Sequence, residues 1–141
     1  MSTIADVMTK NPITIHHDAS VVEILDTLSK CDFDHLPVVN SEERLVGMIS
    51  KSDLYKKTLV LSKTTTGKTY TMKQLEATKA NDIMTARPLS ISPEHSLALA
   101  VEILLQSKFH ALPVVSDEVV VGVVTAKDLL GALQLKLPTV S

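Results

Sequence analysis

The stretch DVMTKNPITIHHDASVVEILDTLSKCDFDHLPVV, residues 6–39, recurs at residues 82–115 as DIMTARPLSISPEHSLALAVEILLQSKFHALPVV. The two segments align without a gap over 34 residues, and 12 positions are identical. Unrelated segments of ordinary composition would share about two. A second match follows, with LVGMISKSDL at residues 45–54 and VVGVVTAKDL at 120–129. An internal repeat predicts two like units that face each other, with any binding site present as a related pair.

The composition favours a globular protein with an aliphatic core. Hydrophobic residues make up 45% of the 141 residues, whereas aromatic residues make up only 3%. A unit of about 50 residues buries too little apolar surface to be secure alone, so we expect the repeats to fold together. Cys31 is the single cysteine, which excludes an intrachain disulfide, and no apolar signal segment or membrane-spanning run is present. We therefore expect a cytoplasmic protein that does not bind a membrane.

Charge is distributed unevenly along the chain. The formal net charge is −2, which argues against a general nucleic-acid-binding protein. Residues 51–80, however, contain seven of the 14 lysines and arginines and only two acidic residues, so they carry +5 and the rest of the chain carries −7. We interpret this basic segment as a solvated surface and keep RNA or DNA binding as a weaker alternative.

Apolar periodicity and turn residues predict a β-α-β-β-α unit in each repeat. A polar lead-in and a brief extended piece come first. Ser20 then begins a helix, with Glu23 three residues later as in a capping box. The equivalent helix at residues 97–106 is apolar nearly all round, so we expect it to be more deeply buried. We expect lead-ins at 3–10 and 79–86, extended pieces at 13–15 and 89–91, hairpin strands at 36–39, 45–50, 112–115 and 119–125, and closing helices at 51–61 and 126–135.

Several chemistries find little support in the chain. Gly67-Lys68-Thr69 resembles the end of a phosphate loop, but Ser62 stands where such a loop needs glycine, and residues 61–80 predict a surface loop with one helical turn. His16 and His17 are adjacent, so in a strand their side chains would point to opposite faces. No histidine has metal-ligand spacing, and Cys31 has no placed catalytic partner. We expect neither a metal site nor an enzyme.

The informative element is the junction between the second strand and the closing helix. It reads Ser50-Lys51-Ser52-Asp53 in one repeat and Thr125-Ala126-Lys127-Asp128 in the other. This pattern is typical of a helix cap, with Asp in place of the usual Glu. The same geometry suits a nucleotide, because helix N–H groups and a hydroxyl can bind phosphate while a carboxylate accepts from two vicinal ribose hydroxyls. Gly47 and Gly122, three residues earlier, permit a close approach to the backbone.

These motifs together resemble the CBS domain pair, a family named after cystathionine beta-synthase. The shared features are a duplicated G-h-h-[ST]-x-x-D junction, an LPVV strand before it, and a D-[VI]-M-T-x-x-P lead-in. The resemblance covers about residues 3–61 and 79–135. It implies an α+β fold of two β-α-β-β-α CBS repeats packed with pseudo-twofold symmetry. The expected boundaries are residues 1–62 for repeat 1, 63–78 for the linker and 79–141 for repeat 2.

The resemblance also implies two adenosine-binding clefts between the repeats. The ribose-binding positions are Asp53 and Asp128, and the phosphate-facing positions are Ser50, Thr125, His35 and His110. Base-lining segments would come from the opposite repeat: Met8, Asn11 and Ile13 for the Asp128 cleft, and Met84, Arg87 and Leu89 for the Asp53 cleft, with Met48 and Val123 as apolar walls. Asp34 and Ala111 depart from the Arg or His of many nucleotide-binding members. Asp34 would repel phosphate, which favours a monophosphate over a triphosphate.

The implied function is a regulatory module that binds an adenosine-containing ligand, AMP or ADP first, without transforming it. ATP or S-adenosylmethionine remain alternatives, and no cofactor is implied. A second hypothesis is a homodimerisation or partner-binding module whose clefts are empty, because the apolar closing helix at 128–137 suits a self-complementary contact. In either case the signal would pass to a protein partner that the sequence does not name.

Overall fold

The computed structural model describes residues 2–31, 34–63, 68–107 and 110–139. The chain divides into two compact units, which cut across the sequence repeats. Unit 1 combines Met1–Pro12 with Leu89–Ser141, and unit 2 is Ile13–Pro88. Each unit therefore contains the hairpin and helices of one repeat together with the lead-in of the other.

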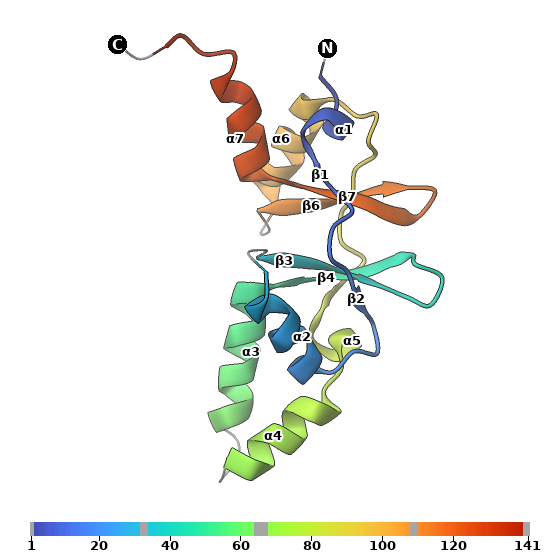
Figure 1. Ribbon diagram of the computed structural model, residues 1–141, viewed down its shortest axis with the longest axis vertical. Coiled ribbons are helices and arrows are strands. Elements are labelled where there is room, and N and C mark those ends of the chain that lie inside the picture. The colour runs from blue at the N-terminus through green and yellow to red at the C-terminus, as the bar shows by residue number, and fades with distance from the viewer. Residues whose placement is uncertain (1, 32–33, 64–67, 108–109, 140–141) are drawn as a thin grey trace. The chain divides into compact units, whose positions relative to one another are not determined.

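Unit 2 is built on a four-stranded sheet with the order β2-β3-β4-β5, of which Figure 1 labels β2, β3 and β4. β2 runs parallel to β3, while β3–β4 and β4–β5 are antiparallel. Pro37 is tolerated inside β3 because β2 pairs only with Val38 and Val39, so no ladder bond on that side needs its missing N–H. The elements are β2 (Ile15–His16), α2 (Val21–Ser29), β3 (His35–Val39), β4 (Leu45–Ser50), α3 (Lys51–Lys63), α4 (Lys68–Ala77), α5 (Ala80–Ile83) and β5 (Thr85–Ala86).

Unit 1 repeats this plan with a three-stranded sheet of order β1-β7-β6, in which both pairs are antiparallel. Where unit 2 has β2, unit 1 has a single parallel bridge between Ile91 and Val114. Ile4, Leu112, Val114 and Val124 are at most 1% exposed and centre its aliphatic core. The elements are α1 (Ile4–Val7), β1 (Thr9–Lys10), α6 (Leu97–Gln106), β6 (Ala111–Ser116), β7 (Val119–Thr125) and α7 (Ala126–Gln134).

The lead-ins, expected only as polar segments, are short helices followed by short strands. Each begins with a carboxylate cap, since Asp6 Oδ2 accepts from the Thr3 amide at 2.8 Å and Asp82 Oδ2 from the Lys79 amide at 2.9 Å. Backbone hydrogen bonds then fix α1 to Pro93 and His95 and fix α5 to His17 and Ala19. These bonds hold each lead-in against its unit, so that β1 and β5 reach the sheet edge in the same way.

The expectation that residues 97–106 form the more deeply buried helix is wrong. α6 buries only Ala100, whereas α2 buries Val21, Ile24 and Leu28. Val101 is 42% exposed and Leu105 is 81% exposed. The cause is tertiary: α4 packs against α2 and α3 in unit 2 (Figure 1), and no described helix of unit 1 covers α6 and α7 in this way. An apolar helix therefore lies open on the surface of unit 1.

The segment between the repeats is also more helical than expected. Where we expected a surface loop with one turn, α4 extends over ten residues. Leu75 of α4 is 8% exposed and belongs to the same core as Leu28 and Leu54, so packing rather than periodicity stabilises this helix. Of the Gly67-Lys68-Thr69 motif, Gly67 lies outside the described residues, and Lys68 and Thr69 begin α4.

The remaining helices and the hairpin strands agree with the sequence, whereas of the extended pieces expected at 13–15 and 89–91 only Ile15, in β2, and Ile91, in a single bridge, pair with a strand. α6, β4 and β7 occupy the predicted residues, and α2 begins after Ser20, whose Oγ accepts from the Glu23 amide at 3.2 Å. Both hairpins form, each with a register shift inside LPVV. In the part of the chain that the structure describes, no helix has the length and apolar character needed to cross a membrane.

Candidate functional site

In unit 1, the junction between β7 and α7 forms a closed capping box. Thr125 Oγ1 accepts from the Asp128 amide at 3.0 Å, and Asp128 Oδ2 accepts from the Thr125 amide at 2.9 Å. The hydroxyl therefore keeps its own O–H to donate, while one carboxylate oxygen already holds a hydrogen bond. The capping interpretation and the ligand interpretation of this motif use the same atoms.

In unit 2, the equivalent box is half closed. Ser50 Oγ accepts from the Asp53 amide at 3.1 Å, and Ser50 is 8% exposed. No described residue donates a hydrogen bond to the Asp53 carboxylate. Asp53 therefore presents two carboxylate oxygens that are free to accept from a bound molecule.

Most of the helix N–H groups at these junctions are already occupied. The first helical amide donates to a carbonyl of the preceding segment, Lys51 to Asp34 at 2.7 Å and Ala126 to His110 at 2.9 Å. The third amide donates to Ser50 or Thr125, as described above. Only the second amide, that of Ser52 or Lys127, has no acceptor among the described residues. Each junction can therefore offer an anion one amide and one hydroxyl, fewer donors than a free helix end provides.

A methionine from the lead-in lies over the glycine of each central strand. β1 pairs with β7 with Thr9 opposite Val123 and Lys10 opposite Gly122, and β5 pairs with β4 with Thr85 opposite Met48 and Ala86 opposite Gly47. A Cβ at Gly122 would lie 2.5 Å from Met8 Sδ, and a Cβ at Gly47 would lie 2.7 Å from Met84 Cγ. A side chain at either position would force the methionine to move, and at Gly122 it would also lie 2.9 Å from the Thr9 carbonyl oxygen, so the close approach anticipated from the sequence is made mainly by a methionine side chain.

The residue before each lead-in proline adopts a left-handed backbone conformation. Asn11 has φ 50° and Arg87 has φ 51°, and their amides donate to Val121 and Val46. Asn tolerates this region, whereas a long side chain such as Arg is strained in it. Strain of this kind is common at binding sites, which makes Arg87 the more informative of the two residues.

The other candidate residues are placed as follows. His35 pairs with Ser50 across β3 and β4 and is partly exposed, while His110 is exposed. Met48 is 1% exposed and Val123 is 7% exposed. Ile13 and Leu89 directly follow the two unit boundaries, so Ile13 is assigned to unit 2 and Leu89 to unit 1, and their side chains are 39% and 65% exposed. Each unit brings together the junction, the central strand and the lead-in of the opposite repeat up to its proline.

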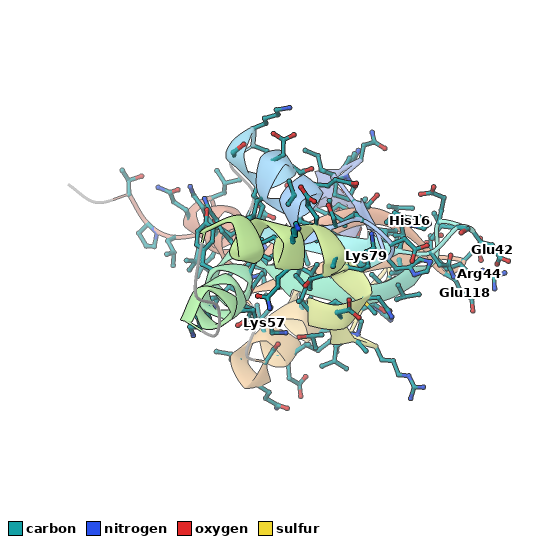
Figure 2. The ribbon with its side chains drawn as sticks, turned by 90° about the horizontal axis from the view of Figure 1, so that it is seen from below. His16, Glu42, Arg44, Lys57, Lys79 and Glu118 are labelled. Atoms are coloured by element: carbon teal, nitrogen blue, oxygen red, sulfur yellow. The ribbon has the colours of Figure 1, made fainter. Side chains whose placement is uncertain are left out.

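The two adjacent histidines do not point to opposite faces, as the sequence had suggested. β2 ends at His16, His17 lies in the following turn, and their ring centroids are 4.5 Å apart. With Asp18 they place potential ligand atoms within 4.8 Å of one another. His16, however, accepts from the Asp18 amide at Nδ1 and contacts Ser41 Oγ at Nε2, beside the Glu42–Arg44 ion pair of the same turn (Figure 2). Both of its nitrogens therefore already have hydrogen-bond partners, which a metal ion at this cluster would have to displace.

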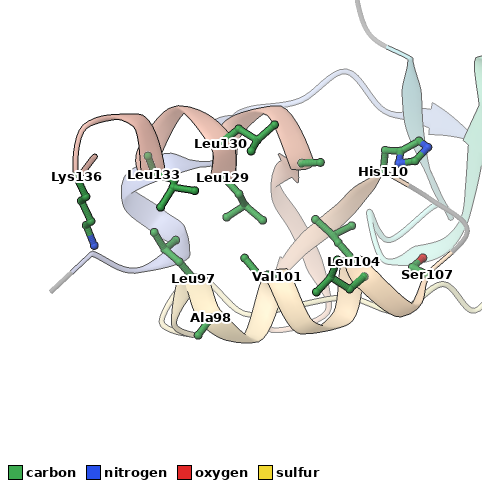
Figure 3. Close-up of a pocket in the computed structure, with 13 residues that line it drawn as sticks. Leu97, Ala98, Val101, Leu104, Ser107, His110, Leu129, Leu130, Leu133 and Lys136 are labelled. Atoms are coloured by element: carbon green, nitrogen blue, oxygen red, sulfur yellow. The ribbon is translucent and has the colours of Figure 1, made fainter. Parts of the chain in front are cut away.

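Two features of the structure were not predicted as such from the sequence, although the apolar character of residues 97–106 and 128–137 is evident in it. Lys57 of α3 donates from Nζ to the Ile83 carbonyl, next to Met84, and Figure 2 labels its position. The other feature is an open apolar groove of about 630 Å³ between α6 and α7, with His110 near one end and Lys136 near the other (Figure 3). A lysine in an exposed helix and an apolar helix face are both common in sequences. Only the packed structure shows that Lys57 bonds to α5 and that the apolar face forms a groove.

Known proteins that match this chain match the duplicated segments. The CBS domain family matches residues 4–59 and 80–135. The uncharacterized protein MJ1426 of Methanocaldococcus jannaschii is 30% identical over an alignment of 152 positions, gaps included. The alignment covers 92% of this chain and 90% of that protein. By contrast, the chain spans only 14% of the A-adding tRNA nucleotidyltransferase of Aquifex aeolicus, to which it is 35% identical. The likeness to that enzyme is thus limited to one region of it.

Solved structures share the architecture. The structure of CBSX2 in complex with AMP has a TM-score of 0.79 and 29% identity, and the match covers 97% of this chain and 100% of that one. CBSX2 is a CBS-pair protein of Arabidopsis thaliana. The CBS domain pair of protein MJ0100, in complex with 5′-methylthioadenosine and S-adenosyl-L-methionine, has a TM-score of 0.80 and 26% identity over 97% of this chain and 99% of that one.

Proposed function

The chain belongs to the CBS domain family, as a pair of CBS domains with an α+β fold, and from this premise we propose that it is a non-catalytic regulatory module for an adenosine-containing ligand. The observation that carries the proposal is the paired junction. In each unit a hydroxyl, a free helix amide and a carboxylate lie at one helix start, and a methionine of the opposite repeat packs on the adjacent strand.

The donors and acceptors of this arrangement match a nucleotide. Asp53 or Asp128 accepts from the two vicinal hydroxyls of ribose, while Ser50 or Thr125 donates its O–H to phosphate. The thioether of Met84 or Met8 offers a polarizable wall to the base. Among the described residues, the Ser50 and Thr125 hydroxyls accept hydrogen bonds from helix amides and neither donates to a general base, so the ligand would be bound and released unchanged.

A ligand with few phosphates fits best. One amide and one hydroxyl per junction are too few donors for a triphosphate, and exposed Asp34 adds negative charge beside the unit 2 junction. We therefore assign AMP or ADP as the ligand. S-adenosylmethionine is the alternative, since it contains the same ribose and adds positive charge; CBSX2 was solved with AMP and MJ0100 with S-adenosylmethionine.

Titration calorimetry with AMP, ADP, ATP and S-adenosylmethionine tests the proposal. We expect saturable heat with AMP or ADP, weaker heat with ATP, and loss of binding in the double variant Asp53→Asn, Asp128→Asn. Chromatography of the ligand after incubation should recover it unchanged. No heat and no thermal shift with any of the four compounds would overturn the proposal, and a converted ligand would overturn its non-catalytic part.

A second function is supported by the groove between α6 and α7, and we propose that this surface pairs with a second copy of the chain. Six of the ten large hydrophobic side chains that are exposed in the described residues lie on these helices or just after them: Val101, Leu105, Leu130, Leu133, Leu135 and Leu137. Monomeric proteins rarely expose apolar patches of this kind. A self-complementary contact would cover the patch on both copies.

Light scattering after gel filtration tests the homodimer. We expect a dimer for the wild type and a monomer for Leu130→Glu, because Leu130 is 64% exposed on α7 and a charge there would be buried in the contact. The matched control is Tyr55→Glu, which changes the equivalent position of unit 2, where the side chain is 51% exposed. A monomeric wild type, or an unchanged dimer in Leu130→Glu, would contradict this proposal and favour an unknown protein partner.

A further inference from the structure

We propose that the two sites are unequal, and that the Asp53 site of unit 2 fills before the Asp128 site of unit 1. This inference rests on the proposed function and extends it, because it ranks two sites that the repeat alone would make equal. Two differences support it. The Asp128 carboxylate accepts a hydrogen bond that the Asp53 carboxylate lacks, and Lys57 of unit 2 is replaced by Ala132 in unit 1.

Asp128 is already used by the fold. Its Oδ2 accepts from the Thr125 amide at 2.9 Å, and its own amide donates to Thr125 Oγ1 at 3.0 Å. A ribose diol that binds this carboxylate with both hydroxyls must share or displace the cap. A hydrogen bond to a charged group contributes enough that losing one weakens binding by about tenfold.

Asp53 does not have this competing partner. Its amide donates to Ser50 Oγ at 3.1 Å, but within the described ranges its carboxylate accepts from no other group. Both oxygens are available to the two hydroxyls of a ribose without loss of a protein hydrogen bond. The unbound protein therefore holds Asp53 in a state closer to the bound one.

Lys57 adds a second difference between the units. It lies one helical turn after Asp53 on α3, and its Nζ donates to the Ile83 carbonyl at the end of α5. The next residue is Met84, which packs on Gly47 of β4. The helix that holds the carboxylate is thus tied to the lead-in that holds the base wall. Ala132 stands at the equivalent position of α7 and has no donor to make such a bond.

Fixing the lead-in before binding lowers the entropy lost when a ligand orders it. Unit 2 therefore has both a free carboxylate and a preorganised wall, and these two contributions outweigh the repulsion between a single phosphate and exposed Asp34 beside the junction. Unit 1 has an engaged carboxylate and a lead-in without this tie. At limiting ligand the protein should hold one molecule, at Asp53, and take a second only at higher concentration. Such a protein would respond to ligand in two separate concentration ranges, one for each site.

Calorimetry with AMP on single variants tests the ranking. Asn has the size of Asp and keeps one carbonyl oxygen, so Asp128→Asn can still accept the cap hydrogen bond from the Thr125 amide. Both Asp53→Asn and Asp128→Asn lose the negative charge that would accept from the ribose hydroxyls. We expect two classes of site in the wild type, separated by about tenfold. Asp53→Asn should lose the tighter class, and Asp128→Asn only the weaker. Lys57→Ala, which copies Ala132, should weaken the tighter class severalfold, and 2′,3′-dideoxy-AMP should bind neither class tightly.

The outcomes separate this inference from the proposed function. If the tighter class survives Asp53→Asn and disappears in Asp128→Asn, or if both variants lose binding equally, AMP binding stands and the ranking is overturned. An unchanged tighter class in Lys57→Ala overturns the role of the lysine. If AMP, ADP and S-adenosylmethionine give no heat with the wild type, both the proposed function and the ranking fail.

Discussion

Units 1 and 2 share a plan but differ in what covers their helices. In unit 2, α4 packs against α2 and α3, and Leu28 of α2 is 2% exposed. In unit 1 the equivalent Leu104 is partly exposed and lines an open groove. The difference shows that duplication copied the hairpin and its caps but not the surroundings of the helices. One unit is completed from within the chain, whereas the apolar face of the other is open, and this is the face that we propose a second copy covers.

The largest expected effect concerns the covering helix of unit 2. Leu75→Ala should lower the free energy of unfolding by about 2–4 kcal/mol, because it removes a buried leucine from the contact of α4 with the core. Urea unfolding measures this change. Lys73→Ala, an exposed position on the same helix, is the control and should stay near the wild type. A Leu75→Ala protein as stable as this control would show that α4 does not complete unit 2.

A smaller effect should separate the two carboxylates in the absence of ligand. Asp128→Ala should lower the free energy of unfolding by about 1 kcal/mol, since it opens a capping box. Asp53→Ala should have almost no effect, because its carboxylate makes no bond within the described residues. Equal destabilisation by the two substitutions in urea unfolding would mean that both carboxylates cap their helices.

The smallest effect concerns the left-handed residues before Pro12 and Pro88. Arg87→Asn should raise the free energy of unfolding by about 1 kcal/mol at most, because Asn adopts this conformation with less strain. The reciprocal Asn11→Arg should lower it by a similar amount. Thermal unfolding of both variants measures the pair, and a loss of stability in Arg87→Asn would show that the Arg87 side chain stabilises the unbound protein.

The strands and capped helices could be predicted from sequence because their signals are local. Ser20 and Ser96 cap their helices through the amides three residues on, and β4 and β7 are apolar runs between turns. α4 could not be predicted, since Leu75 stabilises it through contacts distant in sequence. The prediction that α6 is deeply buried was wrong, because an apolar sequence pattern does not show whether protein or solvent covers the helix.

The candidate site divides in the same way. The repeated motif located Ser50, Asp53, Thr125 and Asp128, and the family resemblance paired each junction with the opposite lead-in. Sequence could not show that Asp128 accepts a cap bond while Asp53 does not, because both motifs have an acid at the same spacing. Lys57 was missed since its acceptor, the Ile83 carbonyl, is a backbone atom of another element.

The most direct test of the account is an AMP titration followed by the methyl signals of methionines labelled with carbon-13. Met84 reports on the Asp53 site and Met8 on the Asp128 site, and Met→Leu variants assign the two signals. We predict that the Met84 methyl shifts as the first equivalent of AMP is added and that the Met8 methyl shifts only later. A Met8 signal that moves first or together with Met84 would contradict the ranking, and two signals that never move would contradict adenosine binding itself.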